Sequence, residues 1–375
     1  MAHQAIYRKW RPLVFDDIVG QEHITRTLKN QILSDAVGHA YLFCGTRGTG
    51  KTTCAKVLSR AVNCLNPQNG NPCNECEVCR GILDGSIMDV TEMDAASNNG
   101  VDDVREIIDG ARRKALDSDY KVYIVDECHM LSTGAWNAML KLLEEPPKTT
   151  VFIMCTTDPQ KIPATILSRV QRYNFSKISL DNIISRLKYI IAEERNELFE
   201  DADPAVYGDP PDYEYDEEAV QYIAKLADGG MRDAITMMDK CLSLNNQLTI
   251  ESVVQALGTV DYNIHFDLLF KMETGVKDSA IRLIEDVYNS GKDLKQFIKQ
   301  FQYFVLDVCK YKMFKDFKYV SIPALPEYQE KLEDEDLELA LKVLEWVRQL
   351  NADIKWESNP KAIAQTAVVL FNPEV

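Results

Sequence analysis

The octapeptide GTRGTGKT at positions 45–52 restricts the possible folds of this chain more than any other stretch. It fits the pattern G-x-x-x-x-G-K-[ST], and it lies between the apolar run AYLFC at 40–44 and the amphipathic run KTTCAKVLSRAVNC at 51–64. A strand, a glycine-rich turn and a helix in this order form a phosphate-binding loop, because the glycines let backbone N–H groups surround phosphate oxygens at a helix N-terminus. The pattern therefore predicts an α/β domain that binds a nucleoside triphosphate.

The residues of this loop have expected roles. Lys51 is expected to reach the β- and γ-phosphates, and Thr52 is expected to place its hydroxyl on Mg²⁺. The other loop residues expected to contact the nucleotide are Gly45, Thr46, Gly48, Thr49, Gly50 and Thr53.

A second apolar run, KVYIVDECHM, delivers two acids at the end of a predicted strand over 121–126. Open α/β sheets bind ligands at the carboxyl ends of their strands, so Asp126 and Glu127 are expected beside the loop. Asp126 is expected to hold the magnesium ion and Glu127 to polarise the attacking water. A third run ends in CTTDP, where the hydroxyl of Thr157, or less favourably Thr156, is expected to position that water or sense the γ-phosphate. An ordinary strand-end turn is the alternative there.

Short apolar runs and amphipathic helical patterns alternate through the first half of the chain, which is typical of βα units around a parallel sheet. The other predicted strands cover 88–94, 151–156 and 172–175. From about residue 179 onward the apolar residues recur at helical spacing with no strand pattern between them. An acidic, proline-containing stretch at 199–216 interrupts this region and is expected to be a solvated or partly disordered insertion.

The chain has 375 residues and a net charge of −16, which favours two or three domains and weighs against a protein that coats nucleic acid. It has no apolar run of the roughly 20 residues that a bilayer span needs. Its N-terminus lacks the apolar region of a secretory signal. The chain is therefore expected to be cytoplasmic and to make no membrane contact.

Four of the ten cysteines are crowded into one polar stretch, NCLNPQNGNPCNECEVCRG at 63–81. Cys64, Cys73, Cys76 and Cys79 are predicted to hold a structural Zn²⁺, since four thiolates leave no open coordination position for chemistry. An iron–sulfur cluster and free thiols are the alternatives. The insert, about 64–80, has too few apolar residues to be held by packing. The other six cysteines lie among apolar neighbours and are predicted to be small core residues.

These motifs, together with YRKWRPLVFDDIVGQEHI, LLEEPP, CTTDPQKIPATILSRVQRY and GGMRDA, resemble the AAA+ ATPases and, within them, the bacterial clamp-loader subunits of the gamma/tau family. The resemblance covers essentially the whole chain. It implies a P-loop AAA+ parallel-sheet domain over 1–178, a small helical lid over 179–243 and an all-α oligomerisation collar over 244–375. The insertion at 199–216 has no clear counterpart in the family pattern.

The resemblance also implies further site residues. Val19 and Gly20 would lie near the adenine base, with Tyr7 and Arg11 close by. An N-terminal segment packed on the sheet is the alternative interpretation, and it is compatible with this role.

Two arginines receive roles from the same resemblance. Arg169 would act in trans as an arginine finger on the γ-phosphate bound by the neighbouring subunit, although Val170 replaces the cysteine of the family's Ser-Arg-Cys motif. Arg232 would reach from the lid onto the nucleotide, so that the lid angle depends on ATP.

The function implied is that of the ATPase motor in a hetero-oligomeric clamp-loader ring of the DNA polymerase III holoenzyme, acting at replication forks in the nucleoid. It would use ATP to load the sliding clamp onto primer-template DNA. The replicative polymerase and helicase are further possible partners through a C-terminal tail beyond residue 375. The sequence contains no visible polymerase active site, so a polymerase label would belong to the assembly. The alternatives are another AAA+ ATPase, of the initiator or branch-migration type, and a zinc-ribbon nucleic-acid-binding regulator whose nucleotide site does not hydrolyse.

Overall fold

The computed structural model describes residues 5–201, 214–245, 247–257, 262–291, 293–323 and 325–373. The chain divides into two compact units, and each is described by itself. The first unit comprises Met1–Pro211 and Ala227–Asp239, and the second comprises Asp212–Leu226 and Lys240–Val375. None of the described helices combines the length and apolar character that a membrane span requires.

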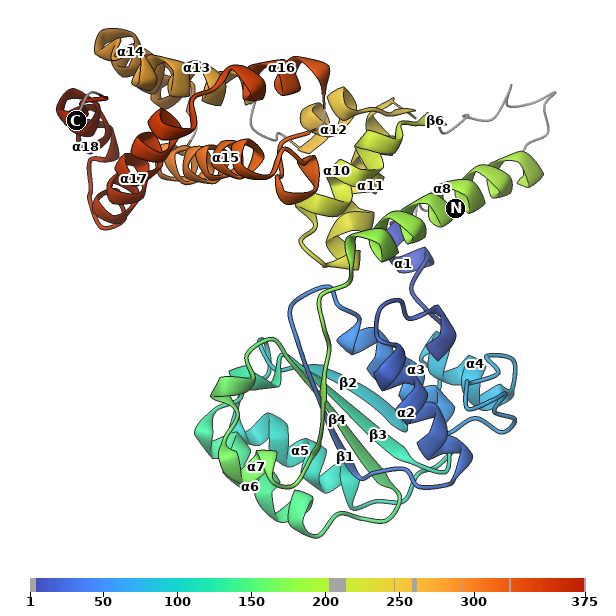
Figure 1. Cartoon of the computed structure of the whole chain (residues 1–375). Coiled ribbons are helices and arrows are strands. Elements are labelled where there is room, and N and C mark those ends of the chain that lie inside the picture. Colours follow the sequence, from blue (N-terminus) through green and yellow to red (C-terminus); the bar gives the residue numbers. More distant parts are fainter. Residues whose placement is uncertain are drawn as a thin grey trace. The chain divides into compact units, whose positions relative to one another are not determined.

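A five-stranded parallel sheet forms the centre of the first unit, with the order β2-β3-β4-β1-β5 (Figure 1). The strands are β1 (Ala40–Cys44), β2 (Val90–Asp94), β3 (Lys121–Asp126), β4 (Thr150–Thr156) and β5 (Gln171–Asn174). The inner strands β1 and β4 are buried along their whole length, which explains why their sequences are continuous apolar runs. The predicted parallel-sheet α/β class is therefore confirmed.

Alternate residues of each strand face the two sides of the sheet, and each side has its own helices (Figure 1). Tyr41 and Phe43 of β1 pack with α2 (Glu22–Leu33) and α3 (Lys51–Ala61). Leu42 packs on the other side with α5 (Val101–Ala111), α6 (Thr133–Glu144) and α7 (Ala164–Leu167). The sheet is thus covered on both faces, as all-parallel sheets require.

Shorter elements and one long helix complete the first unit. They are α1 (Ile6–Lys9), η1 (Phe15–Asp17), α4 (Glu77–Asp84), η2 (Cys128–Met130), η3 (Pro159–Lys161), α8 (Leu180–Asp201) and the first part of α11 (Met231–Asn245), as far as Asp239.

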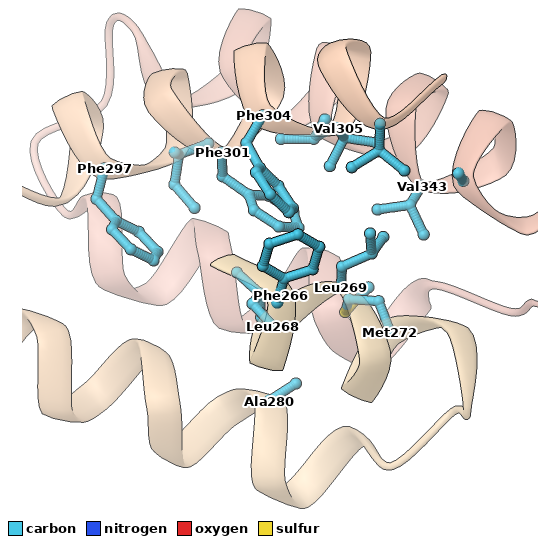
Figure 2. Close-up of a cluster of buried hydrophobic side chains, with 14 of the residues drawn as sticks. Phe266, Leu268, Leu269, Met272, Ala280, Phe297, Phe301, Phe304, Val305 and Val343 are labelled. Carbon is cyan, nitrogen blue, oxygen red and sulfur yellow. The ribbon is translucent and has the colours of Figure 1, made fainter. Parts of the chain in front are cut away.

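The second unit is built mainly from helices. Its elements are β6 (Glu214–Tyr215), α10 (Glu217–Leu226), the end of α11, β7 (Gln247–Leu248), α12 (Ile250–Leu257), α13 (Tyr262–Glu273), α14 (Lys277–Asn289), α15 (Leu294–Phe314), η4 (Phe317–Tyr319), α16 (Pro326–Asp334), α17 (Leu337–Ile354) and α18 (Pro360–Leu370). Helices α13 to α18 enclose an apolar core. Figure 2 shows part of this core, where Phe266 and Leu269 of α13 lie on the side that faces Phe304 of α15 and Val343 of α17.

The predicted helical character of the C-terminal region is confirmed, with one correction. The two-residue strands β6 and β7 pair in parallel, so the region after 179 is not free of strands. Leu248 is buried whereas Gln247 is exposed, a one-residue alternation too short to be recognised as a strand pattern. Of the acidic stretch at 199–216, the structure describes only 199–201, in α8, and 214–216; the remainder lies outside the described residues.

Candidate nucleotide site and cysteine module

A cavity of about 440 Å³ lies at the carboxyl ends of the central strands. The P-loop between β1 and α3 forms its floor, and two of its glycines adopt left-handed backbone conformations, Gly48 with φ 79° and Gly50 with φ 100°. Such angles cost L-residues with a side chain free energy, which explains the glycines at these positions. The cavity is lined by Tyr7, Trp10, Arg11, Pro12, Asp17, Ile18, Val19, Arg47, Gly48, Thr49, Gly50, Lys51, Thr52, Thr53, Asp94, Asp126, Glu127, Ile178, Arg186, Met231, Arg232 and Ile235.

Lys51 and Thr52 begin α3 at the floor of this cavity. Lys51 is 6% exposed, and its ammonium donates to the carbonyls of Gly45 and Thr46, both at 2.9 Å. Burial lowers the pKa of Lys51, while nearby acids oppose that shift. The Thr52 hydroxyl donates to Oδ2 of Asp126 at 2.8 Å, so the P-loop and the end of β3 meet at one point. A hydroxyl and a carboxylate this close can share a magnesium ion.

Glu127 follows Asp126 directly and has φ 46°, a left-handed conformation that is costly for a residue with a side chain. Its Oε2 atom accepts from the Thr157 hydroxyl at 2.9 Å and from the Thr157 backbone N–H at 3.3 Å. The His129 Nδ1 atom lies 3.3 Å from the same oxygen and 3.2 Å from the Thr156 hydroxyl. Residues after β3 and after β4 therefore jointly orient the Glu127 carboxylate.

The N-terminus of α11 lies directly on the P-loop. The Met231 N–H donates to the Gly48 carbonyl at 3.0 Å, and a Cβ atom on Gly48 would come within 2.9 Å of the Gly230 Cα atom. The Arg232 guanidinium lies 4.9 Å from the centre of the Tyr7 ring. A hydrogen bond from Arg8 lowers the pKa of Tyr7, and one from Arg232 lowers it further. The positively charged Arg232 side chain therefore lies in the lining of the cavity, where it could donate hydrogen bonds to triphosphate oxygens.

Arg169 lies away from the cavity, after α7. Its Nη2 atom is 2.6 Å from Oε1 of Glu144, in the LLEEPP segment, and its Nη1 atom donates to the Ser168 hydroxyl at 3.0 Å. The guanidinium is therefore held at the protein surface, on the rim of an open hollow lined also by His39, Leu143, Val170 and Gln171.

The four clustered cysteines converge although they are spread over 16 positions, 64–79. Their Sγ atoms all lie within 4.8 Å of one another, and Cys73 and Cys79 Sγ are 4.0 Å apart. Tetrahedral Zn–S bonds of about 2.3 Å put sulfur atoms roughly 3.8 Å apart, so this donor set fits a metal ion. The Sγ atoms also accept N–H bonds along the segment, from Cys73 to Cys64, from Cys76 to Cys73 and from Cys79 to Cys76. The other six cysteines are all buried, which confirms their predicted place in the core.

The structure brings most of the predicted nucleotide residues together. Gly20, Gly45, Thr46, Thr157 and Arg169 do not line the cavity. The Gly45 and Thr46 carbonyls instead hold Lys51, and Thr157 acts on Glu127. Gly20 packs beside Ile178, where an added Cβ atom would come within 3.3 Å of its Cγ2 atom.

Sequence reasoning missed several polar residues near the chemistry, among them Asp94, Arg186 and His129. Asp94 ends β2 beside the cavity, and its place at a predicted strand end was a usable signal. Arg186 lines the cavity from α8 and donates to the Trp10 carbonyl at 3.4 Å, with no local signal in the sequence. His129 was missed because its contact with Glu127 depends on the η2 turn.

A P-loop after β1, an acidic pair after β3 and a helix that returns to the P-loop define an ATPase fold of the AAA+ class. Two family models match the chain. Residues 20–179 match "DNA polymerase III, delta subunit", and residues 211–247 match "DNA polymerase III clamp loader subunit, ATPase lid domain".

Curated relatives cover more of the chain. DNA polymerase III subunit tau of Bacillus subtilis is 38% identical over 372 residues, which are 98% of this chain and 63% of that protein. DNA polymerase III subunit tau of Escherichia coli is 36% identical over 78% of this chain and 43% of that protein. DNA polymerase III subunit gamma of Buchnera aphidicola from Acyrthosiphon pisum is 38% identical over 71% of this chain and 69% of that protein. The chain belongs to the DNA polymerase III gamma/tau family.

Among solved structures, the Thermotoga maritima RuvB Holliday junction branch migration motor matches with a TM-score of 0.46 and 16% identity, over 72% of this chain and 80% of that chain. The family assignment does not depend on this weak similarity.

Proposed function

We propose that the chain is an ATPase subunit of a clamp loader, which uses ATP to place a sliding clamp on primer-template DNA within the DNA polymerase III holoenzyme. The observation that carries the proposal is the convergence of Lys51, Thr52, Asp126 and Glu127 on one cavity, in a chain of the gamma/tau family. Because the chain spans less than two thirds of the tau proteins it matches, the activity and partners of those longer proteins are part of this proposal.

ATP would lie with its phosphates on the P-loop, where the N–H groups at the start of α3 and the positive end of the helix dipole favour negative charge. Lys51 would leave its two loop carbonyls for phosphate oxygens, which are the stronger, charged acceptors. Thr52 and Asp126 would hold Mg²⁺, which supplies positive charge for the phosphates. Glu127 would polarise the attacking water, oriented by Thr157 and His129.

The two arginines would couple this chemistry to assembly and conformation. Arg169, held at the surface by Glu144, is available to a nucleotide bound by a neighbouring subunit, as an arginine finger in trans requires. Arg232 would contact the phosphates from α11. Since α11 already rests on the P-loop through Met231 and Gly48, a phosphate contact by Arg232 would favour one lid position over another.

The four cysteines would hold a structural Zn²⁺, because four thiolates complete a tetrahedral shell and leave no position for a substrate. Residues 244–375 would serve as the oligomerisation collar of a hetero-oligomeric ring at the replication fork. DNA contacts would be made to backbone phosphates by a local basic face and would weaken with rising salt, whereas the net charge of −16 argues against a protein that coats nucleic acid. Polymerase activity would belong to other subunits of the holoenzyme.

ATP hydrolysis by the chain assembled with its partner subunits and purified clamp tests the proposal. Primed DNA is expected to stimulate hydrolysis in the wild-type assembly, and Glu127→Gln is expected to reduce turnover to a small residual rate while nucleotide binding persists. Equal rates for wild type and Glu127→Gln would favour a nucleotide site that binds without hydrolysing. Turnover without retention of the clamp in a pull-down would favour another DNA-associated AAA+ ATPase.

A further inference from the structure

The cysteine module, defined as residues 64–80, makes a set of polar contacts with the N-terminal segment 11–19. The Leu13 carbonyl accepts hydrogen bonds from Nδ2 of Asn74 at 3.2 Å and from Nη2 of Arg60 at 2.9 Å. Nε of Arg60, which belongs to α3, in turn donates to Oδ1 of Asn74 at 3.1 Å. Asn74 lies between the ligand candidates Cys73 and Cys76, so one carbonyl of the segment is tied directly to the cysteine turn.

A second contact point lies two and three residues further along the segment. The Phe15 N–H donates to Oδ1 of Asn71 at 2.9 Å, and Nδ2 of Asn71 donates to Oδ2 of Asp16 at 2.7 Å. Asn71 is buried, so water could not take the place of its partners if either of these hydrogen bonds were lost. The Lys29 ammonium, on α2, also lies 2.7 Å from Asp16.

The same segment forms one wall of the nucleotide cavity. Arg11 and Pro12 line it before the contact points, and Asp17, Ile18 and Val19 line it after them. The residues that the module holds therefore lie between two groups of cavity-lining residues. A displacement of this short stretch would move both groups, whereas the P-loop, joined to β1 and α3, has separate support.

We propose that the cysteine module positions the base-side wall of the nucleotide cavity, through Asn71 and Asn74 acting on residues 13–16. This inference rests on the proposed ATPase function, since it assigns the 11–19 segment to the adenine side. The module contributes few buried apolar side chains of its own, Val78 among them, so a metal on its four cysteines would help to keep the two asparagines in place.

Asn74→Gly tests the proposal with little risk to folding. Asn74 has φ 59°, a conformation that glycine adopts readily, so the substitution removes the side-chain bonds without straining the backbone. Asn71→Ala removes the second contact point. Arg80→Ala, at an exposed position of α4 in the same module, is the matched control.

Calorimetric titration of the full chain with ADP, and separately with tripolyphosphate, distinguishes the base side from the phosphate side. Asn74→Gly and Asn71→Ala are each expected to raise the Kd for ADP about tenfold and to leave that for tripolyphosphate unchanged, while Arg80→Ala alters neither. Removal of bound zinc by a chelator, with the released metal measured, is expected to raise the Kd for ADP in the same selective way.

ADP affinity unchanged in both asparagine variants would overturn the inference, as would an equal loss of affinity for ADP and tripolyphosphate. If the wild-type chain bound neither ligand, the proposed nucleotide function itself would fail, so the two failures are distinguishable.

Discussion

Removal of the Thr157 hydroxyl is expected to slow ATP hydrolysis without weakening ATP binding. Thr157→Val preserves the size and shape of the side chain but deletes the donor that lies 2.9 Å from Oε2 of Glu127. Thr157 does not line the cavity, so its substitution leaves the surface that meets the nucleotide intact. The carboxylate would lose orientation, and the water that it polarises would lose alignment with the γ-phosphate.

The size of the effect follows from the remaining contacts. A hydrogen bond to a charged acceptor contributes about 1.5–3 kcal/mol, which corresponds to roughly 10- to 150-fold in rate. The Thr157 backbone N–H, at 3.3 Å, and His129, also at 3.3 Å, continue to hold the same oxygen in the variant. The expected fall in kcat is therefore near the lower end, about tenfold, with KM within twofold of wild type.

Phosphate release by the complete assembly, in the presence of clamp and primed DNA, provides the assay. Thr157→Ser retains the hydroxyl and is expected to keep most of the activity. In a Glu127→Gln background, Thr157→Val is expected to have almost no further effect, because residues that act as one unit are not additive. A kcat unchanged by Thr157→Val, or an equal fractional loss in both backgrounds, would refute the orienting role.

Three further predictions concern the P-loop, the subunit boundary and the second unit. Gly48→Ala is expected to destabilise the first unit by about 1–2 kcal/mol and to weaken ADP binding, because the new Cβ atom meets Gly230 in a left-handed backbone conformation; denaturant melts without any shift would contradict this. Arg169→Ala is expected to lower turnover of the assembly by about 10³-fold or more while the isolated chain binds ADP normally, and intact turnover would exclude a finger in trans. Burial raises the pKa of Glu273 to about 9 from an ordinary 4.5, and the neighbouring carboxyl of Glu335 adds to this shift. The contribution of Glu273 to stability is therefore fully present below pH 4.5 and is lost as pH rises toward 9. Glu273→Gln should therefore flatten the decline in unfolding free energy between pH 6 and pH 9, and parallel declines would disprove the assignment.

The chemistry-bearing motifs of this protein could be predicted from the sequence because their residues are neighbours in the chain. The P-loop and the Asp126–Glu127 pair depend on short spacings that follow a strand, and the cysteine cluster depends on a turn-forming insert. The burial of the sheet on both faces could also be predicted from the sequence, because strands covered on both sides, such as β1 and β4, are continuous apolar runs.

The contacts that give those motifs their geometry depend on tertiary structure. The hydrogen bond from Thr157 to Glu127 joins residues 30 positions apart, and that from Phe15 to Asn71 joins residues 56 positions apart. No local spacing or periodicity in the sequence indicates that the two partners of either bond meet. Only the packing of β3 against β4 brings Glu127 to Thr157, and only the fold of the cysteine module brings Asn71 to Phe15. Local sequence patterns predict the secondary structure and motifs of one segment. The orientation of a side chain at a site depends on contacts with other segments, which form only when the chain folds.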